Sequence, residues 1–153
     1  MDMNALPPDF VEFLRLLEEA DVEYLIVGGY AVGYYGYPRT TADMDVWVAV
    51  SPTNAEKLVQ VLHRFGMNDE SVSPSLFLKA DSIIRMGVPP VRIEVLTGID
   101  GVEFTECFRS RTVSEVNGQK INLISLRDLV VNKRASGRHK DLDDLEHLPT
   151  QEN

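Results

Sequence analysis

Two aspartates, Asp43 and Asp45, lie two residues apart in a segment whose pattern predicts a β-strand. The apolar Met44, Val46 and Val48 alternate with them, and side chains at i and i+2 of a strand project from the same face. Neighbouring carboxylates repel, so each raises the free energy of ionising the other unless a cation lies between them. Hard divalent cations such as Mg²⁺ take carboxylate oxygens as ligands. The pattern therefore predicts a metal site at Asp43 and Asp45.

A pair of glycines stands at the end of the preceding predicted strand. Tyr24–Val27 is short and apolar, it runs directly into Gly28 and Gly29, and a short helix is predicted over 30–35. Glycines at a strand end let backbone amides approach an anion, and the N-terminus of the following helix favours negative charge. Taken alone, a glycine pair predicts only a turn. Followed by Asp-x-Asp on the next strand, it predicts a phosphate-binding loop beside a metal site.

Apolar periodicity and turn residues divide the rest of the chain into helices and strands. Helices are predicted over 9–20, 52–65, from 126 onwards and after 137 to 148, and strands over 43–50, 83–86, 91–96, 113–116 and 120–123. This order predicts an α/β (α+β) fold with a helical C-terminus. We expect a single domain over residues 1–153, with its core at about 22–124 and a C-terminal helical segment at about 125–149.

Local signals mark where these elements begin and end. Ser51 and Ser125 are predicted helix N-caps, and Asp128 occupies the capping-box position of the second helix. Asn117-Gly118 is typical of a two-residue hairpin turn. The stretch 67–79 lacks periodicity, so we expect an irregular, flexible loop there.

Composition excludes several classes of protein. The net charge of −9 argues against a broad basic surface for long nucleic acids. No apolar run approaches the ~20 residues of a membrane span, and the first residues lack the regions of a secretory signal. The single cysteine, Cys107, excludes an internal disulfide and fits a reducing compartment. We therefore expect a cytoplasmic protein without a membrane partner.

Positive charge gathers near the C-terminus of this acidic chain. Lys133, Arg134, Arg138, His139 and Lys140 form a local basic cluster. Such a patch suits a phosphate-bearing ligand better than a long duplex, and it is equally typical of a solvated helix face.

The motif Gly-Gly-x-Ala-x-x-x-x-Gly-x-x-Arg-x-Thr-x-Asp-x-Asp, which ends at Asp45, resembles the signature of the nucleotidyltransferase superfamily, the polymerase-beta-like fold. The resemblance implies a mixed β-sheet flanked by helices, with a third carboxylate on a strand beside the Asp-x-Asp strand. Glu94 fits that position because Ile93 and Val95 would face the core and leave Glu94 on the opposite side.

The resemblance extends across about residues 24–148 to a narrower group. Arg-Ile-Glu-Val-Leu-Thr, and the block from Lys133 to Asp141 before the last helix, resemble the small nucleotidyltransferases of the abortive-infection toxin (AbiEii-type) group. The resemblance implies transfer of a nucleoside monophosphate from a nucleoside triphosphate to a hydroxyl, with release of pyrophosphate. Two Mg²⁺ ions, with Mn²⁺ as an alternative, would be held by carboxylates as in other two-metal sites.

The resemblance also implies a role for each site residue. Asp43 and Asp45 would bridge the metal ions, and Glu94 would bind the metal at the attacking hydroxyl or act as its general base. The remaining positions would hold the triphosphate, and they are Gly28, Gly29, Arg39, Thr40, Lys133, Arg138, Lys140 and Asp141. Among the cations, Lys140 ranks highest and joins the carboxylates in the predicted catalytic set.

Several alternatives remain open at this point. The acceptor is a small molecule, a tRNA end or a protein, and an antitoxin is a candidate partner. The chain could instead be a binding module or toxin–antitoxin component that holds a nucleotide without turnover, or a phosphohydrolase using the same metals. Glu94 could pair with Arg92 or Arg85, and Arg39 could be a structural partner of the aspartates.

Tyrosines are dense around the predicted glycine loop. Tyr34, Tyr35 and Tyr37 are expected to belong mostly to the core, and one of them could stack on a nucleotide base. Cys107, next to Phe108, is expected to be a small buried hydrophobe.

Overall fold

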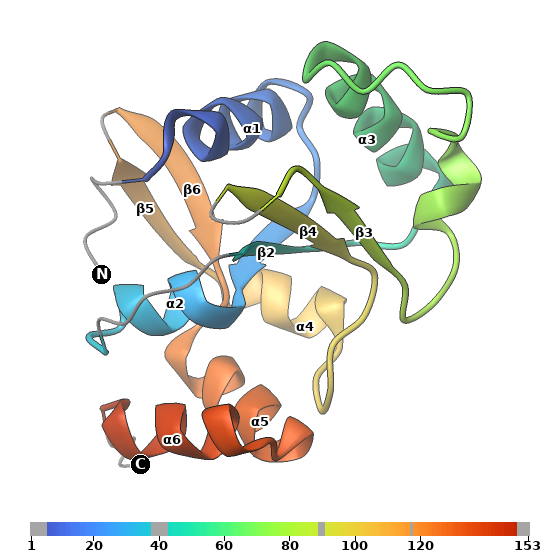
Figure 1. Cartoon of the computed structure of the whole chain (residues 1–153). Helices are drawn as coiled ribbons and strands as arrows, with labels where there is room; N and C mark the ends of the chain where they lie inside the picture. Colours follow the sequence, from blue (N-terminus) through green and yellow to red (C-terminus); the bar gives the residue numbers. More distant parts are fainter. Residues whose placement is uncertain (1–5, 38–42, 89–90, 117, 150–153) are drawn as a thin grey trace.

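The computed structural model describes residues 6–37, 43–88, 91–116 and 118–149 (Figure 1). A 6-stranded mixed sheet has the order β3-β4-β2-β1-β6-β5. The β2–β4 and β1–β6 pairs are parallel, and the other three pairs are antiparallel. The strands are β1 (Tyr24–Val27), β2 (Asp43–Val48), β3 (Ile83–Met86), β4 (Arg92–Leu96), β5 (Thr112–Val116) and β6 (Gln119–Leu123). The structure confirms the predicted α/β class with a mixed sheet.

Helices cover both faces of this sheet. They are α1 (Pro8–Glu19), α2 (Gly28–Tyr34), α3 (Pro52–Arg64), η2 (Pro74–Phe77), α4 (Phe104–Arg109), α5 (Leu126–Ser136) and α6 (His139–His147). The main core lies between one face and helices α1 and α3. A second core lies between the other face and helices α4 and α5, and α6 packs on α5 (Figure 1). Over the described residues, no helix is long and apolar enough to cross a membrane.

Strand β2 divides its side chains between the two cores. Met44, Val46 and Val48 are completely buried in the main core, as the alternating pattern predicts. Trp47 packs in the second core on the opposite face. Asp43 and Asp45 share that second face, so they lie at the end of the strand where this core gives way to polar side chains.

Both predicted serine N-caps are confirmed. Ser51 Oγ accepts a hydrogen bond from the Asn54 amide at 3.1 Å, and Ser125 Oγ accepts one from the Asp128 amide at 3.1 Å. The Asp128 carboxylate differs from the predicted capping box, because it accepts a hydrogen bond from Ser110 Oγ at 2.8 Å. This contact ties the start of α5 to the end of α4, a short helix that the sequence patterns did not predict.

The predicted irregular loop over 67–79 contains an ordered turn. Residues Pro74–Phe77 form the short helix η2, and Phe77 is completely buried in the main core. The prediction of a flexible loop is therefore wrong for these residues. A single aromatic side chain anchors the segment, a signal that no periodic pattern reveals.

We expect Phe77→Ala to lower the free energy of unfolding by about 3–5 kcal/mol, because it removes a fully buried ring and leaves a cavity. The neighbouring Leu78 is 41% exposed, so Leu78→Ala is the matched control and should cost less than about 1 kcal/mol. Urea unfolding of the two variants and the wild type measures the difference. Equal losses would show that η2 is not anchored by Phe77.

Candidate active site

The register of two parallel strands brings the predicted carboxylates together. Asp45 on β2 lies directly beside Glu94 on β4, and Asp43 lies beside Arg92. The partner of Asp45 on the other side is Val27, the last residue of β1. The site therefore forms at the sheet edge where β1 ends and where β2 and β4 begin. The predicted strand position of Glu94 is confirmed.

Gly28 follows β1 immediately and begins helix α2 at this edge. Its φ is +66°, which L side chains rarely adopt, and a Cβ added to it would overlap the Asp45 carboxylate. Glycine is therefore needed both for the backbone turn and for the close approach of Asp45. Gly29 is buried in the first turn of α2. That the two glycines hold phosphates stays a prediction.

Asp45 is held in surroundings that oppose its ionisation. Burial, followed by the charges of Glu94 and Asp43, raises its pKa from 3.8 to about 7. Its Oδ1 atom is buried and has no hydrogen-bond partner among the described residues. A buried carboxylate that faces two like charges and keeps an unsatisfied oxygen is destabilising for the folded protein, so its position here indicates function.

Asp43 has the opposite environment. Arg92 Nε donates to Asp43 Oδ1 at 3.0 Å, and Arg92 Nη2 donates to Oδ2 at 2.8 Å. These hydrogen bonds lower the pKa of Asp43 against the opposing effect of burial. The same Nη2 is 3.5 Å from Glu94 Oε1, and Arg85 Nε is 3.2 Å from that oxygen.

Arg92 is the residue of this site that sequence reasoning assigned too narrowly. The sequence suggests it only as a partner of Glu94, whereas its fork contacts Asp43 on the neighbouring strand. The available signal was its position at i−2 from Glu94, which puts both side chains on one face of β4. The missing information was the register between β2 and β4.

The donor set fits a hard divalent cation. Carboxylate oxygens are the ligands that Mg²⁺ prefers, and the unpaired Oδ1 of Asp45 is a buried acceptor that a cation would satisfy. Among the described residues, no group of three or more His, Cys, Asp or Glu side chains is arranged to coordinate a metal ion by itself. Since Mg²⁺ usually takes few protein ligands and completes its shell with water and phosphate, the carboxylates fit such an ion without forming a cage.

The start of helix α6 contributes positive charge to the same edge. Lys140 is exposed, and its charge favours the ionised forms of both Asp43 and Asp45, although less strongly than Arg92 or burial act. Arg138 precedes the helix, is 64% exposed at its side chain, and donates from Nε to Asp141 Oδ2 at 2.8 Å. Lys140 therefore lies within electrostatic range of both aspartates, and its catalytic role stays a prediction.

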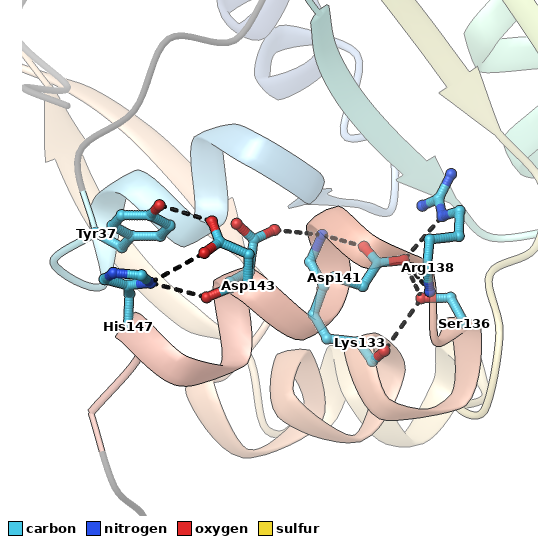
Figure 2. A network of polar contacts seen from close by, with 8 residues as sticks. Tyr37, Lys133, Ser136, Arg138, Asp141, Asp143 and His147 are labelled. Atoms are coloured by element: carbon cyan, nitrogen blue, oxygen red, sulfur yellow. Dashed lines mark hydrogen bonds and ion pairs between the residues drawn. The ribbon is translucent and has the colours of Figure 1, made fainter.

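Lys133 and Asp141 occupy different positions from those expected for triphosphate ligands. Lys133 Nζ lies 3.0 Å from Asp141 Oδ1 and 3.1 Å from Asp144 Oδ2, and all three side chains are at least 96% buried (Figure 2). Ser136 Oγ adds a hydrogen bond to Asp141 Oδ2 at 2.8 Å. The predicted approach of Lys133 to a phosphate is corrected, because two buried carboxylates already hold its charge.

Hydrogen bonds explain why Asp141 is stable as an ion in this interior. Burial opposes its charge, but Arg138, Ser136 and Lys133 donate to it and together lower its pKa. These contacts brace the junction between α5 and α6. Lys133 and Asp141 therefore hold the N-terminus of α6, and with it Lys140, beside the sheet edge.

Tyr37 connects this helix to the segment after α2. Its ring stacks on His147 with centroids 4.0 Å apart and planes at 8°, and its hydroxyl donates to Asp143 Oδ2 at 2.8 Å (Figure 2). Tyr35 donates to the Ile124 carbonyl at 2.6 Å. Both tyrosines thus make the packing contacts expected of core residues, and stacking on a base stays a prediction. Arg39 and Thr40 lie outside the described residues.

A mixed six-stranded sheet flanked by helices matches the nucleotidyltransferase-like class of fold. The chain belongs to the family described as nucleotidyl transferase of unknown function (DUF2204), whose model matches residues 8–151. It is an enzyme of the nucleotidyltransferase type.

Two solved structures share the fold. One is a protein from Thermotoga maritima, provisionally assigned as a nucleotidyltransferase, with 15% identity, a TM-score of 0.62, and coverage of 90% of this chain and 88% of that one. The other is an antigenic nucleotidyltransferase-like protein from Paracoccidioides brasiliensis, with 20% identity, a TM-score of 0.50, and coverage of 93% and 76%. No curated protein matches the sequence. The narrower AbiEii-type resemblance stays a prediction.

We expect Asp45→Asn to stabilise the metal-free protein at pH 8 by about 2–4 kcal/mol. The folded state holds the Asp45 proton up to about pH 7, whereas the unfolded chain releases it near pH 4, so wild-type stability falls between these values as pH rises. The advantage of the variant should shrink as the pH approaches 4. Urea unfolding in EDTA at several pH values measures it, with exposed Glu70→Gln as control. An advantage that does not change with pH would contradict the raised pKa.

We expect Lys133→Ala to lower the free energy of unfolding by about 3–5 kcal/mol, because it leaves two buried carboxylates without their shared cation. The next residue, Arg134, is exposed, so Arg134→Ala is the matched control and should change stability by about 0.5 kcal/mol or less. Denaturant unfolding compares them. A variant that keeps its stability and loses nucleotide binding would instead place Lys133 on the phosphates.

Proposed function

We propose that this protein is a divalent metal-dependent nucleotidyltransferase that moves a nucleoside monophosphate from a nucleoside triphosphate to an acceptor hydroxyl. The observation that carries the proposal is the pairing of Asp45 with Glu94 across β2 and β4 while Asp45 keeps a buried, unpaired oxygen. A cation bound to this carboxylate would satisfy its oxygen and balance its charge. The family and the fold support nucleotidyl transfer as the class of reaction.

Each residue of the site has a role in this reaction. Bound Mg²⁺ or Mn²⁺ would neutralise charge on the attacking and leaving oxygens. Asp43 and Asp45 would hold the cations, and Glu94 would supply a further carboxylate ligand or accept the proton of the attacking hydroxyl. The amides of Gly28 and Gly29 approach the triphosphate from the start of α2.

Two cations at the start of α6 complete the triphosphate side. Lys140 is exposed near the carboxylates and serves as a point charge for the phosphates. Arg138 uses Nε on Asp141, which leaves its terminal nitrogens for a phosphate oxygen. Arg39 and Thr40 belong to the same proposal on the strength of the sequence motif.

The block from Lys133 to Asp141 supports the narrower proposal of an AbiEii-type enzyme that acts in the cytoplasm. Its acceptor would be a small molecule, a tRNA end or a protein, and an antitoxin would be a partner if the enzyme is a toxin. One observation favours a second candidate, a nucleotide-binding module without turnover, because the Arg92 fork occupies both oxygens of Asp43. A single assay separates the two.

In this assay the purified protein is incubated with Mg²⁺ or Mn²⁺ and each labelled nucleoside triphosphate, together with total tRNA and cell extract. We expect label on an acceptor and release of pyrophosphate. Because Asp45 holds the cations, Asp45→Asn should reduce both by at least about 100-fold. The exposed Glu70→Gln variant should retain wild-type activity.

Other outcomes identify the competing functions. Metal-dependent nucleotide binding with no pyrophosphate would support the binding module. Free phosphate with no modified acceptor would show a phosphohydrolase.

A further inference from the structure

Arg92 spans the carboxylates of the two strands at the active site. Its fork uses Nε and Nη2 on the two oxygens of Asp43, at 3.0 and 2.8 Å, and Nη2 also lies 3.5 Å from Glu94 Oε1. The side chain is 31% exposed, so part of it remains accessible to a ligand. The guanidinium therefore occupies the region between Asp43 and Glu94.

This contact conflicts with metal binding through Asp43. A bidentate arginine occupies one lone pair on each carboxylate oxygen, and its positive charge repels a cation that approaches the same carboxylate. Asp45 differs, because its Oδ1 has no partner and is ready to accept a ligand. A cation at Asp45 would satisfy that oxygen, whereas a cation at Asp43 is opposed by the Arg92 guanidinium until Arg92 moves away.

We propose that Arg92 is a positioning residue that exchanges partners, holding Asp43 until the metal ion arrives and then binding the phosphate group that is transferred. The inference rests on the proposed function and deepens it. A planar guanidinium fork fits a phosphate as well as it fits a carboxylate, and Glu94 keeps the released group near the reaction centre. Metal and nucleotide then bind cooperatively, because each favours the rearranged Arg92.

Arg85 provides a matched control for this inference. Its Nε lies 3.2 Å from the same Glu94 oxygen, so removing it changes the charge of the site in the same sense. Its side chain is 55% exposed and contacts Glu94 on β4, whereas the Arg92 fork is hydrogen-bonded to Asp43 on β2. The two arginines therefore share charge and a partner and differ in the contact with Asp43.

The first measurement is Mn²⁺ binding to the protein without nucleotide, after EDTA has removed bound metal. The electron paramagnetic resonance signal of free Mn²⁺ reports the binding. We expect Arg92→Gln to bind Mn²⁺ about 3- to 10-fold more tightly than the wild type, because Mn²⁺ no longer competes with the Arg92 guanidinium for Asp43. Arg92→Lys keeps the charge without the fork and should lie between them. Arg85→Gln should change the affinity less than about 2-fold, because only charge is removed.

The second measurement is binding of a non-hydrolysable nucleoside triphosphate analogue at saturating Mn²⁺. We expect Arg92→Gln to weaken it by roughly 10-fold, through loss of a charged hydrogen bond to phosphate. A variant that binds Mn²⁺ more tightly and the nucleotide analogue more weakly supports partner exchange, because loss of a merely structural residue would not strengthen one ligand and weaken the other. If Arg92→Gln weakens both ligands or neither, the inference is overturned. If the wild type and Asp45→Asn both fail to bind Mn²⁺, the proposed function fails instead.

Discussion

Repulsion among three carboxylates is the constraint on which this structure depends. Asp43 and Asp45 share one face of β2, and the parallel register puts Glu94 beside Asp45. The charges of Asp43 and Glu94 disfavour ionisation of Asp45, and the burial of Asp45 disfavours it further. The fold holds these groups together because Met44, Val46 and Val48 anchor the opposite face of β2 in the main core. The favourable free energy of hydrophobic burial on one face of β2 thus offsets the repulsion between carboxylates on the other face.

Cations from separate elements relieve part of this repulsion. Arg85 comes from β3, Arg92 from β4, and Lys140 from the start of α6. Arg85 contacts Glu94, and Arg92 contacts Asp43 and lies near Glu94, while the charge of Lys140 acts from the start of α6. Asp45 keeps a buried oxygen that has no hydrogen-bond partner among the described residues. Arginines therefore balance charge at Asp43 and Glu94, whereas Asp45 between them lacks a close cation within the described part of the chain, and a substrate-bound metal ion would bind there.

Sequence patterns predicted the parts of the molecule that depend on local chemistry. The alternation in β2, the serine N-caps at Ser51 and Ser125, and the strand containing Glu94 all follow from periodicity or capping. Burial of Phe77 and the Arg92 contact with Asp43 did not follow, because each depends on a partner distant in sequence. The composition of the site could therefore be predicted, and its internal pairing could not, since pairing is set by strand register.

Two buried charged groups in this chain show how structure and function can be told apart. Lys133 lies among Asp141 and Asp144 with close ion pairs, and its charge is balanced within the protein. Asp45 is also withdrawn from water, yet it faces two further carboxylates and keeps an unpaired oxygen. Both residues belong to motifs that resemble catalytic ones, so residue type alone assigns them the same role. The charges around them separate the two, because Lys133 has its counter-charges within the fold, whereas Asp45 faces like charges and is tolerated where a ligand completes it.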